Sequence, residues 1–370
     1  TDKMPLAPHE FALMDMLFSN SDAFLCKPQT GYETCRYVFF PGCQAGAIAP
    51  DVVMDAYEDL CARVEGGVGL ILGCCGAISE WAGRYEMTEK VNEQLKQELA
   101  KLGDPVIIAG CPSCMKQLKE NTGAEVRGIW EILKEIGLPG KARGLEMPVA
   151  IHDACGARGD ARTQDTIREL LTAMGCTVED TEYSRDLSPC CGYGGLTAYA
   201  NKEMAAKMTE KCLERSDAPY ITYCMACRDR FAREGRESRH ILELLYGDNA
   251  CNMPDISEKR YNRLVLKEKL LKNIWNEELM MEKKDYTVAY TEDAIRMMDE
   301  RMILKSDVEH VLADYRESQE AVFDEETKEL VTRSRLGNVT FWVRFVETEE
   351  GYLVHRAYSH RMNIMKRVGQ

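Results

Sequence analysis

The chain has 370 residues, of which 45% are hydrophobic and sixteen are cysteine. This length and apolar content predict a folded protein of two or three domains, and they exclude a disordered tail or a disulfide-stapled mini-protein. The net charge of −14 argues against nucleic acid or an anionic membrane surface as a partner, because both are bound through basic patches. No apolar run is long enough to span a membrane, and residues 1–10 lack signal-peptide features, so we expect a cytoplasmic protein.

Short apolar runs and helical patterns alternate through residues 37–247. β-Branched and aromatic runs bounded by glycine or proline predict buried strands at residues 37–40, 106–108, 149–151 and 220–223. Apolar residues at i, i+3 and i+4 spacing predict helices at residues 51–64, 91–102, 163–174 and 196–215. The alternation predicts an α/β fold with mainly parallel sheets, divided into two related cysteine-rich units at residues 37–147 and 148–247 after an N-terminal segment of residues 1–36.

The cysteines indicate that these two units are an internal duplication. Each unit holds a single cysteine, then an adjacent pair followed by glycine, then a Cys-x-x-Cys motif. The five positions recur in order at shifts of 112, 116, 116, 113 and 113 residues. The two sets are Cys43, Cys74, Cys75, Cys111 and Cys114 in the first unit, and Cys155, Cys190, Cys191, Cys224 and Cys227 in the second.

Four of these cysteines come directly after predicted strands: Cys43, Cys111, Cys155 and Cys224. In open α/β sheets, functional groups gather beyond the carboxyl ends of the strands. We therefore expect cysteines more than thirty residues apart in the sequence to meet at one edge of each sheet.

The rest of the chain has a different character. Residues 248–285 are rich in Lys, Glu and Asn and predict a connector with an exposed or docking helix at residues 257–271. Residues 286–370 hold no cysteine and predict a small α+β domain, with helices at residues 292–301 and 306–315 and strands at 329–335, 339–347 and 352–360. Turns at Gly337-Asn338 and Glu350-Gly351 suit a hairpin meander. This domain is interpreted as a docking surface for a partner subunit or as a folded appendage.

Five cysteines in each unit favour an iron–sulfur cluster over the alternatives. Iron–sulfur clusters are held by cysteine thiolates on turns that let the sulfurs approach the iron. A structural zinc ion takes four ligands and usually draws them from two Cys-x-x-Cys knuckles, whereas each unit here offers only one. Zinc, disulfides and free thiols remain as alternatives at this point.

The duplicated pattern resembles the cysteine-rich (CCG) domain family, and specifically the catalytic B subunit of heterodisulfide reductase. The resemblance covers residues 37 to about 247 and includes the motifs Phe-Pro-Gly-Cys43, Gly-Cys74-Cys75-Gly, Cys111-Pro-Ser-Cys114, Cys155-Gly, Pro-Cys190-Cys191-Gly-Tyr-Gly-Gly and Cys224-Met-Ala-Cys227. It implies that each five-cysteine set holds one noncubane [4Fe–4S] cluster, and that the two clusters face a cavity in which a disulfide is cleaved.

The same resemblance implies partners. The chain has no C-x2-C-x2-C-x3-C-P run, so electrons are expected to enter from another polypeptide. In the family these partners are a ferredoxin-like iron–sulfur subunit, the C subunit, and a flavoprotein, the A subunit; the remaining partner is a small disulfide or thiol substrate. Nucleotide-binding loops and metalloprotease motifs are also missing from the sequence.

Several other residues are candidates for the site. His152 is interpreted as a catalytic proton donor or as a structural hydrogen bonder. Asp153, Arg158, Glu80 and Trp81 flank cysteines and are expected near the cavity. Lys116 and Arg228 follow the Cys-x-x-Cys motifs and are interpreted as ligands for an acidic substrate or as helix-surface charges. The six cysteines outside the repeat are expected to be buried or incidental thiols: Cys26, Cys35, Cys61, Cys176, Cys212 and Cys251.

Three functions are compatible with the sequence. The first is the catalytic subunit of a heterodisulfide-reductase-like complex that reduces or forms a disulfide. The second is an iron–sulfur electron-transfer subunit of a flavin-dependent dehydrogenase. The third is a zinc-bound scaffold or redox sensor.

Overall fold

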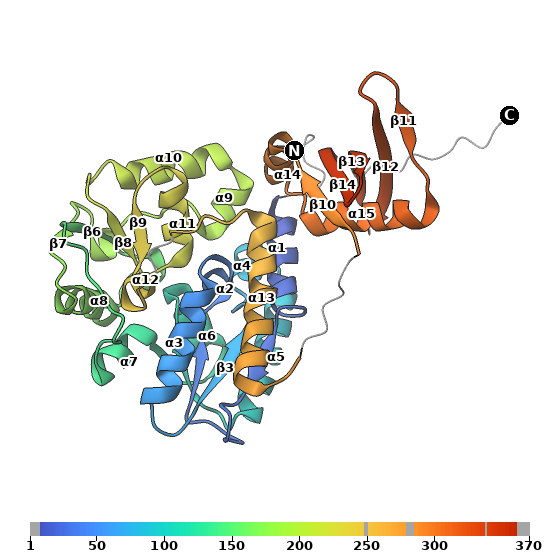
Figure 1. The fold of residues 1–370 in the computed structure, drawn as a ribbon. Helices are drawn as coiled ribbons and strands as arrows, with labels where there is room; N and C mark the ends of the chain where they lie inside the picture. Colours follow the sequence, from blue (N-terminus) through green and yellow to red (C-terminus); the bar gives the residue numbers. More distant parts are fainter. Residues whose placement is uncertain (1–7, 248–250, 279–284, 337–338, 361–370) are drawn as a thin grey trace. The chain divides into compact units, whose positions relative to one another are not determined.

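The computed structural model describes residues 8–247, 251–278, 285–336 and 339–360 of the chain. It divides into two compact units (Figure 1). The larger unit comprises Ala12–Pro254 and Lys259–Leu279, and the smaller comprises Thr1–Phe11, Asp255–Glu258 and Met280–Gln370. In the described residues, no helix is long and apolar enough to cross a membrane.

The first repeat is built on a five-stranded sheet in the order β1-β3-β2-β4-β5. All neighbouring strands are parallel except β1, which is antiparallel to β3. The strands are β1 (Leu25–Lys27), β2 (Tyr37–Phe40), β3 (Val68–Leu72), β4 (Val106–Ala109) and β5 (Val126–Gly128). The helices are α2 (Cys43–Ile48), α3 (Pro50–Arg63), α4 (Ala77–Trp81), α5 (Tyr85–Lys101), α6 (Pro112–Thr122) and α7 (Ile129–Ile136).

The second repeat has a four-stranded parallel sheet in the order β7-β6-β8-β9, which matches β3-β2-β4-β5 strand for strand. Its strands are β6 (Val149–His152), β7 (Val178–Asp180), β8 (Tyr220–Thr222) and β9 (Ser238–His240). Its helices are η1 (Cys155–Ala157), α8 (Ala161–Ala173), η2 (Arg185–Leu187), η3 (Gly194–Leu196), α9 (Thr197–Ala200), α10 (Lys202–Leu213), α11 (Met225–Arg233) and α12 (Ile241–Leu245). The predicted α/β class with tandem, mainly parallel sheets is confirmed.

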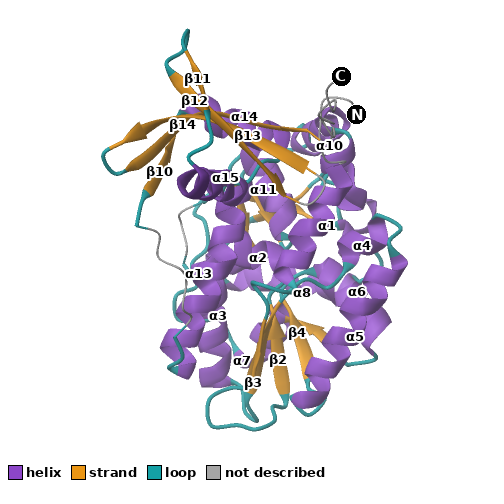
Figure 2. Cartoon of the chain, turned by 90° about the vertical axis from the view of Figure 1, so that its right-hand side faces the viewer, coloured by secondary structure: helices purple, strands orange, loops and turns teal. Residues whose placement is uncertain are grey.

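Helices cover both faces of the first sheet (Figure 2). Phe39 and Leu70 pack with α3 and α7 on one face, whereas Val38 and Ile71 pack with α5 and α6 on the other. The core on the α3 side continues into the second repeat, where it includes Ile151 on β6 and residues of α8 and α12. The two repeats therefore share one hydrophobic core.

Two helices outside the repeats pack side by side against the first repeat (Figure 1). They are α1 (Pro8–Ser19) and α13 (Ile256–Trp275), and the buried side chains of α13 include Arg263, Leu266 and Leu270. The helix predicted at residues 257–271 therefore exists and docks on the protein. The structure describes no more than part of the predicted connector at 248–285, because residues 248–250 and 279–284 lie outside the described residues.

The single helix predicted over residues 196–215 is wrong. The chain forms a 3₁₀ turn at Gly194–Leu196 and the short helix α9, and it begins α10 only after Asn201. Leu196 has a left-handed backbone, with φ of 62°, and the Asn201 side chain caps α10 by accepting a hydrogen bond from the Met204 N–H. Apolar spacing did not reveal this break, because the interrupting residues keep a helical pattern.

The smaller unit is an α+β fold. Its sheet has the order β10-β14-β13-β12-β11, and the antiparallel meander β12 (Glu329–Leu336), β13 (Val339–Thr348) and β14 (Gly351–His360) agrees with the three predicted strands. The sequence did not reveal the edge strands β10 (Thr287–Tyr290) and β11 (Val322–Asp324). The helices α14 (Glu292–Arg301) and α15 (Lys305–Ser318) share a core with β13 and β14. The predicted turn at Gly337-Asn338 lies outside the described residues.

Candidate metal centre

The ends of four parallel strands deliver the single cysteines and the Cys-x-x-Cys motifs, as predicted. Cys43 begins α2 just after β2, and Cys155 begins η1 just after β6. Cys111 and Cys224 are the N-cap residues of α6 and α11, so the second cysteine of each motif lies in the first helical turn. Helix N-termini stabilise anions through free N–H groups and the helix dipole, which favours thiolates at these positions.

The five sulfurs of the first set form a connected group. All five line one cavity, and neighbouring thiols perturb each other's pKa along the series Cys43, Cys74, Cys75, Cys114 and Cys111. The Cys114 and Cys74 side chains lower the pKa of Cys75 to about 5, whereas Cys74 raises the pKa of Cys43.

The second set forms an equivalent group. Neighbouring thiols perturb each other's pKa along the series Cys155, Cys190, Cys191, Cys227 and Cys224. The Cys155 and Cys191 side chains lower the pKa of Cys190 to about 2, and the Cys190 side chain raises the pKa of Cys191 to about 12. The Gly192 N–H also points to the Cys190 sulfur, at 3.4 Å.

The two sets meet at a seam between the repeats. Cys111 of the first set and Cys224 of the second line the same cavity, and the Cys224 side chain lowers the pKa of Cys111 after the larger effect of Cys114. Close backbone packing holds the seam, since a Cβ atom on Gly156 would lie 2.8 Å from the backbone nitrogen of Ser113. The two sets therefore lie beside each other at the seam.

A cavity opens beside the first set and reaches the seam. Its lining includes all five cysteines of the first set and Cys224 of the second. Trp81 and Tyr193 contribute aromatic walls, and Met225 lies beside Cys224. Trp81 is thus at the cavity as expected from the sequence, whereas Glu80 is exposed and is absent from the lining.

The donor set and its surroundings fit an iron–sulfur cluster at each position. Five thiols gathered at one site cannot all ionise without compensating cations, and cluster iron would supply that charge. Glycine lets the backbone approach the site: Gly42 has φ of 88°, and a Cβ atom there would lie 3.2 Å from the Cys114 sulfur.

Unpartnered buried N–H donors beside the cysteines support the same fit. Arg263 of α13 is 4% exposed; its Nε donates to the Cys43 carbonyl at 3.0 Å and its Nη1 to Asp15 at 2.8 Å. Its Nη2 has no hydrogen-bond partner among the described residues. A cluster bound at the cysteines would supply the acceptor that this buried donor lacks.

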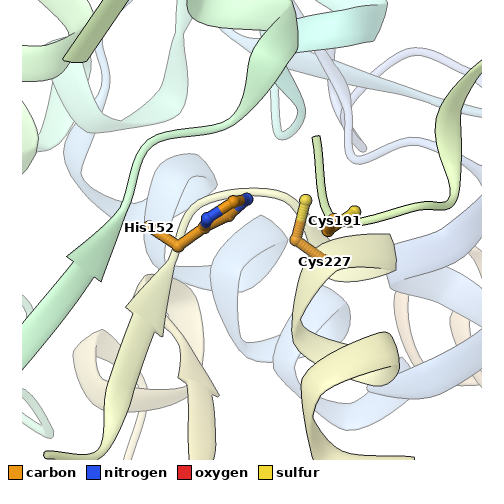
Figure 3. Close-up of side chains that lie close together, drawn as sticks. All are labelled: His152, Cys191 and Cys227. Carbon is orange, nitrogen blue, oxygen red and sulfur yellow. The ribbon is translucent and has the colours of Figure 1, made fainter. Parts of the chain in front are cut away.

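His152 is the matching donor at the second set. It ends β6 and is 3% exposed, and its ring lies close to Cys191 and Cys227 (Figure 3). One ligand atom from each of the three residues lies within 4.8 Å of the other two, and the His152 Nε2 has no hydrogen-bond partner among the described residues. Burial lowers the pKa of His152 to about 4, so the ring is neutral at pH 7. The Nε2 atom of His240, at the end of β9, likewise has no hydrogen-bond partner among the described residues. Burial lowers the pKa of His240, and the charge of Cys111 opposes this effect.

The other predicted polar residues lie elsewhere. Asp153 is buried in an ion pair with Arg168 and accepts a hydrogen bond from Tyr223, which accounts for it structurally. Arg228 is neither a substrate ligand nor a surface charge, because it is fully buried against Glu243 at 2.7 Å. Lys116 and Arg158 are exposed and line a separate groove on the seam.

None of the sixteen cysteines is in a disulfide. Of the six outside the two sets, Cys35, Cys176 and Cys212 are buried, and Cys26, Cys61 and Cys251 are half-buried. The prediction of buried or incidental thiols agrees with these positions.

Two segments of the chain, residues 37–119 and 149–232, match the family described as cysteine-rich domain (CCG). Each matched segment, called a cysteine-rich domain below, contains one of the two five-cysteine sets. An uncharacterized iron–sulfur protein of Methanocaldococcus jannaschii is 29% identical over 170 residues, covering 44% of this chain and 33% of that protein. An uncharacterized iron–sulfur protein of Methanococcus maripaludis is 27% identical over 208 residues, covering 53% of this chain and 40% of that protein. The matches thus span two fifths or less of these relatives. No solved structure matches the chain significantly.

The sequence did not reveal every residue at the cysteine-rich domains. Arg263 lies in a Lys- and Glu-rich segment that resembles an exposed helix, and nothing local distinguishes it from its neighbours. Asn20, which accepts a hydrogen bond from the Cys74 N–H at 2.7 Å, lies before both domains. His240 could have been singled out from the sequence. It is one of six histidines and directly precedes an apolar helix, whereas His152 shortly precedes Cys155 of the second set.

Proposed function

We propose that this chain is an iron–sulfur oxidoreductase that binds one [4Fe–4S] cluster, of the noncubane type, in each cysteine-rich domain. Cys43, Cys74, Cys75, Cys111 and Cys114 would hold the first cluster, and Cys155, Cys190, Cys191, Cys224 and Cys227 the second. Such clusters supply one-electron transfer. The naming of two relatives as iron–sulfur proteins supports the assignment.

The proposed reaction is the reduction of a small disulfide, or its reverse. Cleavage of one S–S bond consumes two electrons and two protons and releases two thiols. The observation that carries this proposal is a cavity lined by all five cysteines of the first set and by Cys224 of the second. Trp81, Tyr193 and Met225 give the cavity an apolar wall suited to the carbon skeleton of a thiol.

The electrons are proposed to come from separate proteins in the cytoplasm, a ferredoxin-like iron–sulfur subunit and a flavoprotein subunit. The smaller α+β unit is proposed to dock one of these subunits. As an alternative, the chain would pass electrons to a dehydrogenase and would not reduce disulfides.

The test is metal and sulfide analysis of anaerobically purified protein, with electron paramagnetic resonance before and after addition of thiols. About eight irons per chain and thiol-dependent spectra are expected. Cys111→Ser and Cys224→Ser should each disturb one cluster, whereas the matched variant Cys176→Ser, at a buried cysteine outside both sets, should keep the full iron content.

Zinc without acid-labile sulfide would refute the proposal and would favour a zinc site at His152, Cys191 and Cys227. Full clusters without reduction of any disulfide in a reduced-dye assay would favour the dehydrogenase alternative.

A further inference from the structure

A groove of about 460 Å³ lies on the outer side of the seam between the two cysteine-rich domains. Its walls come from α6, β5 and α7 of the first repeat and from the stretch running from η1 to the start of α8 in the second. Five basic residues and three carboxylates line it, an excess of two positive charges. The basic residues, which define this cationic groove, are Lys116, Lys119, Arg127, Arg158 and Arg162.

The carboxylates of the groove pair with some of its basic residues and leave others without an ion-pair partner among the described residues. Glu131 pairs with Arg162 at 3.0 Å and also lies 3.6 Å from Arg127. Asp160 is engaged as the N-cap of α8, where it accepts hydrogen bonds from Thr163. Among the described residues, no carboxylate lies within ion-pair distance of Lys116 or Lys119, and both are exposed. Their charges are therefore available to a partner.

The cationic groove adjoins one ligand of each cysteine set. Pro112 and Gly156 are part of its lining, and they are the residues that follow Cys111 and Cys155. No cysteine of either set lines the groove, so a small molecule bound in it would have no access to a cluster. An electron carrier docked over the groove, in contrast, would come within one residue of both proposed cluster sites.

We infer that the cationic groove is the docking site for an acidic electron-carrier protein, an inference that rests on the proposed function. The chain as a whole carries a charge of −14, so an acidic partner is repelled elsewhere and is steered to a locally positive surface. Each exposed ion pair contributes little, so one small anion would bind weakly, whereas a protein surface with several carboxylates engages the groove collectively.

The test compares reduction of the full-length protein by an acidic ferredoxin and by a photoreduced deazaflavin, a small reductant. The variant Lys116→Glu/Lys119→Glu should lower the ferredoxin rate by about tenfold or more at low ionic strength and leave the deazaflavin rate unchanged. The matched control is Lys90→Glu/Lys96→Glu on α5, which makes the same change in net charge at two exposed lysines that have no ion-pair partner among the described residues. The control should change the ferredoxin rate less than twofold.

Equal ferredoxin rates in the wild type and the groove variant, or equal losses in both variants, would overturn the inference. So would an unchanged ferredoxin rate together with loss of pyrophosphate binding by calorimetry, which would assign the groove to a small anion. Absence of iron would instead contradict the proposed function; binding of oxidised ferredoxin, measured separately with both variants, would then still decide the docking site.

Discussion

Replacing Arg263 tests whether α13 controls the first proposed cluster. In Arg263→Gln, the site loses a buried charge, the hydrogen bond to the Cys43 carbonyl and the unpartnered Nη2 donor. A hydrogen bond to a charged group contributes about 1.5–3 kcal/mol. If about 1–2 kcal/mol of this favours the reduced site, the reduction potential of the first cluster should fall by about 40–90 mV for a one-electron couple.

The assay is a potentiometric titration followed by electron paramagnetic resonance, in which the second cluster serves as an internal reference. The control is Arg260→Gln, because Arg260 also contacts Asp15, at 3.3 Å, but makes no hydrogen bond to the cysteine loop in the described structure. The control should leave both potentials in place. A shift of both clusters together, or of neither, in Arg263→Gln would refute the reasoning.

The variant should also lower stability. Removing Arg263 leaves the half-buried Asp15 with only the longer contact to Arg260. Loss of one partner of a fully buried pair costs about 3–5 kcal/mol, so the loss of stability here should be smaller. Thermal unfolding followed by circular dichroism measures this loss, and potentials are compared only below the unfolding transition.

Three further changes have defined outcomes. His152→Phe gives β6 the same final residue type as β2, which ends at Phe40. The iron content should be kept, and the reduction potential of the second cluster should fall by less than the shift expected for Arg263→Gln. An unchanged potential would make His152 purely structural. Gly156→Ala should destabilise the protein by about 1–3 kcal/mol in urea unfolding, because its Cβ would clash with Ser113, whereas Gly140→Ala, with nothing within 4 Å, should have little effect; equal effects would contradict close packing at the seam. Arg228→Met or Glu243→Gln alone should lower the free energy of unfolding by about 3–5 kcal/mol, and the double variant should lower it by less than the sum of the two. A double-mutant cycle that shows no coupling energy would contradict the buried ion pair.

The sequence predicted the strands that carry the ligands because these strands are buried on both faces. The runs at 37–40 and 149–151 are apolar throughout, as a central parallel strand requires. Strand β3, at Val68–Leu72, has the same continuous apolar pattern but is not among the predicted strands. The three-residue strands β5 and β7 could not be predicted, because Val126–Gly128 and Val178–Asp180 carry no distinctive pattern and are fixed only by pairing with their neighbours.

The cysteine sets were predictable for a related reason. Ligand chemistry restricts each position to cysteine, and the strand ends bring those positions together. The hydrogen-bond donors around the cysteines are less predictable, because several residue types can place an N–H group near a sulfur or a loop carbonyl. Arg263 reaches Cys43 from 220 residues away in the sequence, so only the packing of α13 reveals it.

The duplication supplies two equivalent sets of ligands, but residues that are not repeated make the two sites unequal. Phe40 and Gly128 end β2 and β5, whereas the matching strands β6 and β9 end in His152 and His240. The first site instead receives a charged donor, Arg263, from a helix outside both cysteine-rich domains. Hydrogen bonds from a charged donor are roughly twice as strong as neutral ones, and positive charge favours the reduced form of a cluster. If each set holds a cluster as proposed, the two clusters would differ in their affinity for an electron. The first would hold it more tightly, and this difference would give electron flow between them a direction.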